Sequence, residues 1–393
     1  MKLDRKTAAP VITRERIGVS LMFLMNGFYV GAWAPKIPEF AERLSLNETR
    51  LGLMILVFGL GSLVFMPIAG SQIPRLGSMK VTRIASIMLT PLLILLSIVS
   101  EVWEAAIVIF LFGGLIGAMD VAMNANAVAT ERGMRRAIMS SCHAFWSLGG
   151  LIGSATGGVL IAHLGVLGHS IAATVGGAIV LVIGLPMLLS DLPEKSETAP
   201  KRGLPLTPLP WLIGVVALFS MVPEGAVIDW SALYLRNELN ASLSLSGFAF
   251  AAFSMTMAAM RFAGDVVRDR LGAVLTMRLC GIIAIIGLVI AGLAPSPYVA
   301  IPGFALAGIG ISNMVPIAFS AAGNLPGMAP GVALSVVTVM GYSGILVAPS
   351  VIGFVANHVG LGVVYLTLPG LLLVVLLLSS LARYAEQDHA AAK

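Results

Sequence analysis

Long apolar runs separated by short polar turns dominate this chain. Twelve of these runs reach about 20 residues, the length that a helix needs to cross the hydrocarbon core of a bilayer. Backbone hydrogen bonds in lipid must close within each segment, so the runs should be α-helices despite their many Val, Ile and Gly residues. The predicted helices are 18–37, 51–73, 81–100, 103–127, 138–163, 170–189, 210–234, 246–267, 275–294, 298–322, 331–356 and 362–381.

The second half of the chain repeats the first at an offset of 195 residues. The turn 75–77 (Arg-Leu-Gly) matches 270–272, and Gly165 matches Gly360. Matching glycines indicate shared turns or shared close approaches of the backbone. We therefore expect two pseudo-symmetric six-helix bundles, 1–190 and 209–393, joined by a polar cytoplasmic linker at 191–208. Two like-oriented membrane halves are the plan of a solute carrier.

Composition and charge agree with a membrane protein. The chain is 58% apolar and 11% charged, whereas a soluble domain carries roughly 25% charged residues. Nineteen Lys and Arg residues fall on the side of the predicted N-terminus, and the opposite side holds only Lys36, Arg43, Arg50 and Arg236. By the positive-inside rule, both termini are cytoplasmic. The net charge of +5 is then a topology signal, and we expect no nucleic-acid binding.

A motif between the second and third helices points to a family. Residues 70–80 read Gly-Ser-Gln-Ile-Pro-Arg-Leu-Gly-Ser-Met-Lys, and the second copy contains Asp265 and the pair Asp269–Arg270. With twelve helices, this pattern resembles the major facilitator superfamily, although Pro74 replaces the Asp expected in the first copy. The resemblance implies an all-α membrane protein with the major facilitator fold.

The same turns suit a gate at the cytoplasmic face. A short basic turn with glycine lets two helices pack closely, and Asp269 can hold partners across the seam between the halves in only one conformation. We predict gating roles for Arg75, Asp269 and Arg270. The alternative is that these charges only set the topology.

The fifth helix carries glycines at 149, 153, 157 and 158, with Ser154 among them. The spacing resembles a motif of proton antiporters, in which a proline stands at the position of Ser154. The eleventh helix repeats the spacing with Gly344 and Gly353, so close helix packing is the alternative.

Three ionisable residues lie deep in predicted helices: Asp120, Glu224 and Arg261. A charge near the bilayer centre costs on the order of 2.5–3.5 kcal/mol, so such residues usually face a cavity or a partner. Carboxylates that are alternately hydrated and buried can load and release protons. We predict proton coupling by Glu224 and Asp120, with Arg261 as counter-charge or substrate ligand. The alternative is a static ion pair between the halves.

The surroundings of the two carboxylates differ. Asn124 follows Asp120 by one helical turn, so their side chains should point together. Pro223 and Gly225 flank Glu224, a context that can break a helix and free backbone groups for ligands.

Further polar and aromatic residues are candidate substrate contacts. His143 and Trp146 share a face of the fifth helix, and Asn26 and Tyr29 share a face of the first. Aromatic faces beside amide and carboxylate groups suit a sugar-like or other polar ring. The predicted substrate-binding residues are Asn26, Tyr29, Asn124, His143, Trp146, Arg261 and Asn313. Packing within the bundle is the alternative for each.

Within the superfamily, the runs 119–127 and 142–150 look like bacterial inner-membrane permeases related to the fucose permease group. This resemblance implies a multi-pass protein of the bacterial inner membrane. It also implies a proton site on the fourth helix, which Asp120 matches. The first helix has Asn26 and Tyr29 in place of the acidic partner found in that group.

Together these features predict a monomeric secondary transporter in the lipid bilayer, which moves a small polar solute with protons by symport. The alternative is a proton-coupled antiporter that exports a metabolite or a drug. The sequence contains no metal-ligand spacing, nucleophile elbow or phosphate loop. We therefore expect no enzymatic activity, no cofactor and no metal.

Overall fold

The computed structural model describes residues 12–46, 48–191, 205–241, 245 and 248–386. Within these residues, eleven helical spans are long and apolar enough to cross a membrane. One of them, 139–187, is interrupted at Gly165, where φ is 70° and ψ is 174°. It therefore consists of two membrane-crossing arms, and all twelve predicted helices are present.

The first half of the chain forms six crossings. The third consists of two short helices, and the fifth and sixth are the two arms of one long element. Its elements are α1 (Arg14–Trp33), η1 (Ala34–Lys36), α2 (Ile37–Arg43), α3 (Glu48–Leu76), α4 (Ser78–Leu89), α5 (Leu92–Ile98), α6 (Val102–Met134), α7 (Met139–Gly184) and η2 (Leu185–Met187).

The second half has the corresponding elements. They are α8 (Leu209–Asn237), α10 (Phe248–Leu271), α11 (Ala273–Gly292), α12 (Pro297–Ile311), α13 (Met314–Gly323), α14 (Pro330–Val359), α15 (Leu361–Leu378) and η3 (Ser379–Ala385).

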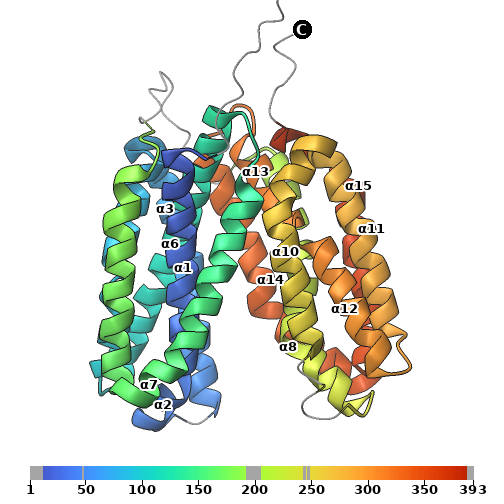
Figure 1. The fold of residues 1–393 in the computed structure, drawn as a ribbon, viewed down its shortest axis with the longest axis horizontal. Coiled ribbons are helices and arrows are strands. Elements are labelled where there is room, and N and C mark those ends of the chain that lie inside the picture. Colours follow the sequence, from blue (N-terminus) through green and yellow to red (C-terminus); the bar gives the residue numbers. More distant parts are fainter. Residues whose placement is uncertain (1–11, 47, 192–204, 242–244, 246–247, 387–393) are drawn as a thin grey trace, which may run out of the picture.

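The two halves stand side by side, and their ribbons converge at one end of the molecule and diverge towards the other (Figure 1). The helix α1 begins and η3 ends at the converging end, which we call the terminal end (upper end of Figure 1). Most of the predicted linker, residues 192–204, lies outside the described residues.

Paired glycines confirm that both halves use the same turns. Gly77 and Gly272 precede α4 and α11 with φ of 82° and 78°, and ψ of 152° and 159°. Gly165 and Gly360 have φ of 70° and 84° where consecutive crossings meet. Only glycine adopts this backbone region without strain, which explains why these positions match at the repeat offset.

The glycines of α7 pack against α1. A Cβ atom on Gly149 would lie 2.0 Å from the carbonyl oxygen of Leu24, and one on Gly27 would lie 2.0 Å from that of Trp146. No side chain fits at such distances, so these glycines let the two backbones touch. The small-residue stripe of the fifth crossing therefore has a packing role within the first half.

The break in a membrane helix occurs elsewhere than the sequence suggested. The helix α8 runs without interruption through Pro223, Glu224 and Gly225. The tenth crossing breaks instead, because α12 ends at Ile311 and α13 begins at Met314. Neighbouring residues can satisfy the backbone around a proline within a helix, so the Pro-Glu-Gly sequence alone did not locate the break.

Candidate functional site

The guanidinium of Arg261 on α10 is the centre of a buried polar cluster. Its Nη2 lies 3.1 Å from Oε1 and 3.4 Å from Oε2 of Glu224 on α8. Its Nη1 donates to Oγ of Ser147 on α7 at 2.9 Å. The side chains of Arg261 and Glu224 are 7% and 18% exposed. Because Ser147 belongs to the first half, this cluster joins the two halves.

The broken tenth crossing supplies a further ligand to Arg261. Nε of Arg261 donates to the carbonyl oxygen of Ser312 at 3.3 Å, and Ser312 lies between the end of α12 and the start of α13. A broken helix leaves carbonyl groups without an intrahelical partner. The break therefore places an acceptor beside a buried cation.

Asp120 and Asn124 form a second polar group on α6. Nδ2 of Asn124 donates to the carbonyl oxygen of Asp120 at 2.9 Å and lies 3.4 Å from its Oδ1. The remaining oxygens, Oδ2 of Asp120 and Oδ1 of Asn124, are buried without a hydrogen-bond partner among the described residues. The helix α6 therefore carries two buried oxygen acceptors that no described side chain or backbone group binds.

Trp146, Asn26 and His143 form a further polar and aromatic group in the first half. Nε1 of Trp146 donates to Oδ1 of Asn26 at 2.9 Å, and Nδ2 of Asn26 donates to the carbonyl oxygen of Ile116 at 3.1 Å. The ring of His143 contacts Phe319 of the second half, with 5.5 Å between ring centroids. Its Nε2 is buried and finds no partner in the described part of the chain.

Two other predicted substrate contacts are placed differently. The Tyr29 hydroxyl donates to the carbonyl oxygen of Thr90 at 3.3 Å, and its ring packs on Gly177 inside the first half. These contacts of Tyr29 lie within the first half, and its role in substrate binding stays a prediction. Asn313 packs against Gly264 of α10. A Cβ atom at Gly264 would lie 1.8 Å from Oδ1 of Asn313, so only glycine leaves room for this side chain.

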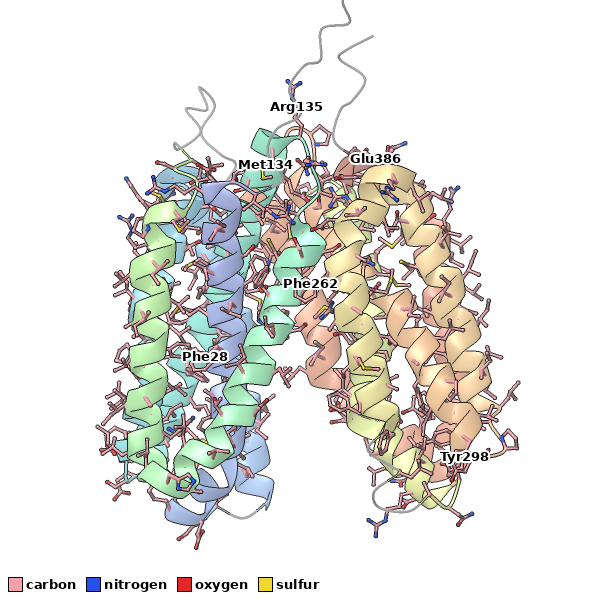
Figure 2. The ribbon with its side chains drawn as sticks, in the orientation of Figure 1. Phe28, Met134, Arg135, Phe262, Tyr298 and Glu386 are labelled. Carbon is pink, nitrogen blue, oxygen red and sulfur yellow. The ribbon has the colours of Figure 1, made fainter. Side chains whose placement is uncertain are left out.

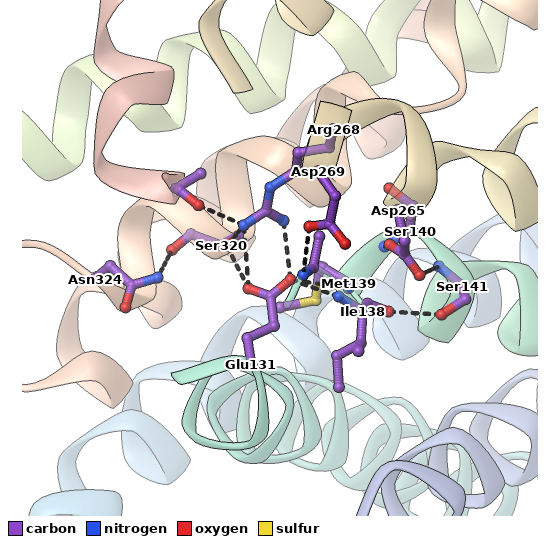
Figure 3. Close-up of polar contacts among 12 residues, drawn as sticks. Glu131, Ile138, Met139, Ser140, Ser141, Asp265, Arg268, Asp269, Ser320 and Asn324 are labelled. Carbon is purple, nitrogen blue, oxygen red and sulfur yellow. Dashed lines mark hydrogen bonds and ion pairs between the residues drawn. The ribbon is translucent and has the colours of Figure 1, made fainter. Parts of the chain in front are cut away.

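A second buried cluster closes the seam at the terminal end, and we call it the seam lock: Glu131, Arg268 and Ser320 (Figure 3). Nη1 of Arg268 lies 2.9 Å from Oε1 of Glu131, and Oγ of Ser320 donates to Oε2 of Glu131 at 2.5 Å. The same Glu131 accepts the backbone N–H groups of Ile138 and Met139. The side chains of Glu131 and Arg268 are 0% and 3% exposed.

Two aspartates of α10 accept backbone N–H groups at the start of α7 and just before it. The carboxylate of Asp265 accepts the backbone N–H groups of Ser140 and Ser141 at 2.9 and 3.1 Å (Figure 3). Asp269 accepts the N–H of Ala137 at 3.0 Å. Negative charge at a helix N-terminus is favourable because the helix dipole is positive there. These contacts hold α10 of the second half to α7 of the first.

The other predicted gate residues do not take part in these contacts. Arg75 and Arg270 are exposed, and neither makes a side-chain hydrogen bond or ion pair with a described residue. Sequence reasoning did not identify Glu131 and Arg268 as a pair. The spacing Asp265-x-x-Arg268-Asp269 was the available signal, since three of the five residues are charged at a predicted helix end.

Small residues let α3 of the first half pack closely against α14 of the second, on the other side of the seam from α7 and α10. A Cβ atom on Gly70 of α3 would lie 2.5 Å from the carbonyl oxygen of Gly331 and 2.7 Å from Cβ of Ser335, both on α14. The seam at the terminal end is therefore charged where α6 and α7 meet α10, and glycine-packed between α3 and α14.

The contact between α7 and α10 weakens away from the terminal end. Residues 137–142 are all buried, whereas residues 154–156 of the same helix are all exposed. Between them, Phe145 contacts Phe262 of α10 with 5.8 Å between ring centroids. Figure 2 shows Phe262 on the side of α10 that faces α7. The halves are joined at the terminal end and become accessible towards the other.

Comparisons with known proteins agree with this architecture. A family model of the Major Facilitator Superfamily matches residues 19–325 and 214–393. The chain is 34% identical over 367 residues to an uncharacterised MFS-type transporter of Yersinia pestis, covering 93% of this chain and 94% of that protein. It is also 34% identical to the membrane protein MosC of Rhizobium meliloti, covering 88% and 84% of the two chains.

Solved structures show the same fold at lower sequence identity. The Escherichia coli fucose:proton symporter FucP is 17% identical with a TM-score of 0.75, covering 93% of this chain and 97% of that one. The human organic anion transporter MFSD10 is 17% identical with a TM-score of 0.74, covering 93% and 99%. The family model, the relatives and the fold together show that the chain belongs to the Major Facilitator Superfamily and is a multi-pass membrane transporter.

Proposed function

We propose that the chain is a secondary active transporter that moves a small polar solute across the bacterial inner membrane by alternating access, in symport with protons. The observation that carries this proposal is the buried contact of Arg261 with Glu224 and Ser147. It places a titratable group at the seam of the two halves, where the chain must rearrange during transport. The description of FucP as a fucose:proton symporter supports the same assignment.

Protonation of Glu224 would change what Arg261 binds. An ionised Glu224 neutralises the guanidinium, whereas a protonated one leaves the buried cation without its counter-charge. An unpaired buried charge is costly, so Arg261 would then favour another anion or acceptor. A substrate atom could then take the place of the ionised carboxylate beside the guanidinium. Proton binding, substrate binding and the contact with Ser147 are thereby linked.

Unpaired buried atoms on α6 and α7 suit a hydroxyl-rich solute. Asp120 and Asn124 each present a buried oxygen acceptor, and His143 presents a ring nitrogen, all unpaired in the described structure. Hydroxyl groups can donate to the oxygens and either donate to or accept from the imidazole. The indole of Trp146 would cover an apolar face of the solute. We therefore propose a sugar-like or other polar metabolite as the substrate.

The seam lock and the two capping aspartates would form the gate. If the terminal end is cytoplasmic, as the distribution of Lys and Arg predicts, the molecule is closed to the cytoplasm and faces outwards. Opening to the cytoplasm then requires separating Glu131 from Arg268. The predicted gate thus includes Asp269, but its buried part is a pair that the motif did not identify.

The test uses purified protein in liposomes with an imposed pH gradient. A thermal-shift screen of sugars, nucleosides, amino acids and organic acids first selects a solute. We expect an inward-directed proton gradient to accumulate the labelled solute, and Glu224→Gln to abolish accumulation while it leaves solute exchange partly intact. The matched control is Asp229→Asn, which changes an exposed carboxylate on the same helix.

Two results would contradict the proposal. Proton-driven accumulation at an unchanged rate in Glu224→Gln would remove Glu224 from the coupling mechanism. Expulsion of the solute under the same gradient would identify an antiporter, the alternative direction. The glycine stripe of α7 gives antiport no separate support, because it packs on α1.

A further inference from the structure

A groove of about 580 Å³ lies on the outer face of the first half, away from the seam. It runs between α4 with the following Thr90 and Pro91 on one side and the second arm of α7 with η2 on the other. Its walls are mainly apolar and include Ile87, Pro91, Ala178 and Val182. Ile87 and Val182 are 52% and 75% exposed. In a protein that spans a bilayer, this face meets lipid.

A break in the third crossing shapes the groove. The helix α4 ends at Leu89 and α5 begins at Leu92, with Pro91 between them. The carbonyl oxygen of Thr90 accepts the hydroxyl of Tyr29 at 3.3 Å and that of Thr174 at 3.2 Å. The carbonyl group of Thr90 is therefore bound by two hydroxyls, one of them from Thr174 in the groove wall, and the rest of the wall is mainly apolar.

The repeat shows that the groove is a departure from the shared scaffold. In the second half, α11 continues through the equivalent positions, Ile285 and Ile286. Leu373 stands at the position of Ala178, and Leu377 at that of Val182. Smaller residues and a broken helix in the first half thus leave space where the second half carries larger side chains.

Two arginines lie at the end of the groove nearest the terminal end. Arg83 lines the groove, is exposed, and makes no side-chain hydrogen bond or ion pair with a described residue. Its repeat counterpart Arg278 instead donates to Oγ of Ser379 at 3.0 Å. Arg14 donates to the carbonyl oxygen of Pro186, which also lines the groove, at 2.9 Å.

We propose that this groove binds an anionic phospholipid from the leaflet at the terminal end. One acyl chain would lie along Ile87, Pro91, Ala178 and Val182, and the phosphate would bind Arg83 and Arg14. Arginine matches phosphate in charge and in hydrogen-bond geometry, and basic pockets beside membrane helices select anionic headgroups. This site is separate from the transport pathway, so the proposal does not rest on the proposed substrate or coupling.

The test measures lipid binding by the full-length protein in detergent with native mass spectrometry. The probes are phosphatidylglycerol and phosphatidylcholine with identical acyl chains, each added in turn. We expect phosphatidylglycerol to bind more tightly, and Arg83→Gln to weaken its binding about fivefold. The matched control, Arg278→Gln, should leave it unchanged. Ala178→Leu, which introduces the residue of the second half, should reduce binding of both lipids by filling the groove.

Three outcomes would overturn the proposal. Equal binding of the two lipids would remove the role of the headgroup charge. An equal loss in Arg83→Gln and Arg278→Gln would indicate a general effect of surface charge. Displacement of phosphatidylglycerol by inorganic phosphate at an equal concentration would identify the free anion as the ligand. Size-exclusion profiles and thermal unfolding of each variant establish that it is folded.

Discussion

Replacing Glu131 by glutamine should open the terminal end of the molecule. In the structure Glu131 is fully buried and receives Arg268, Ser320 and two backbone N–H groups. Glutamine retains one oxygen acceptor but turns the other into a donor, which would face Ser320 and the guanidinium. Arg268 would remain buried without its counter-charge.

The size of this effect follows from the burial of the pair. Removing one partner of a buried ion pair costs about 3–5 kcal/mol. The cost applies only to the conformation in which the seam is closed, because water solvates Arg268 once the halves separate. Even the lower value shifts the equilibrium between closed and open terminal ends by roughly a hundredfold. The variant should therefore populate the open state.

Spin-label distances across the terminal end measure this shift. Cysteines at Gly133 and Arg383, which are exposed residues of the two halves, carry the labels, and the native Cys142 and Cys280 are buried. Double electron–electron resonance should show a longer distance between the two spin labels in Glu131→Gln than in the parent protein. Lys80→Gln, a change of an exposed charge at the same end, is the control. An unchanged distance distribution in Glu131→Gln would refute the role of the seam lock.

Three further changes test other parts of the structure. Gly70→Leu should open the terminal end in the same distance measurement, because a side chain there would collide with Gly331; an unchanged distance would contradict the close approach. Tyr29→Phe should leave solute affinity within about twofold, since the hydroxyl binds Thr90, and a large loss would return Tyr29 to the site. Trp146→Phe should weaken solute binding by about fivefold, because the smaller ring covers less of the apolar face of the solute, a loss of about 1 kcal/mol; unchanged affinity would assign Trp146 to packing.

The architecture could be predicted because the bilayer restricts it so strongly. Every crossing must be an apolar helix of about 20 residues, so twelve runs led directly to twelve crossings. The repeat was visible because Gly165 and Gly360 hold backbone angles that other residues avoid. The contact of Glu224 with Arg261 was foreseen as one of two pairings, since buried charges in lipid need partners.

The seam lock, the position of Tyr29 and the helix break could not be predicted, because they depend on which segments meet in three dimensions. Glu131 stands at a helix end, where a charged residue is ordinary, and its partner Arg268 is 137 residues away. A helical stripe shows that Tyr29 lies on a face shared with Asn26, but it does not show which neighbouring helix that part of the face meets. Gly308, Gly310 and Pro316 flank the break at Ser312, but glycine and proline are common in membrane helices, so they did not distinguish this site from Pro223.

The burial of the seam lock also bears on how the protein responds to its surroundings. Dissolved ions screen exposed charges over about 8 Å at physiological ionic strength, but they screen buried pairs much less. Because the side chains of Glu131 and Arg268 are 0% and 3% exposed, salt in the cell should hardly alter their attraction. The conformational balance would then remain steady during osmotic stress, when the internal potassium concentration of a bacterium changes.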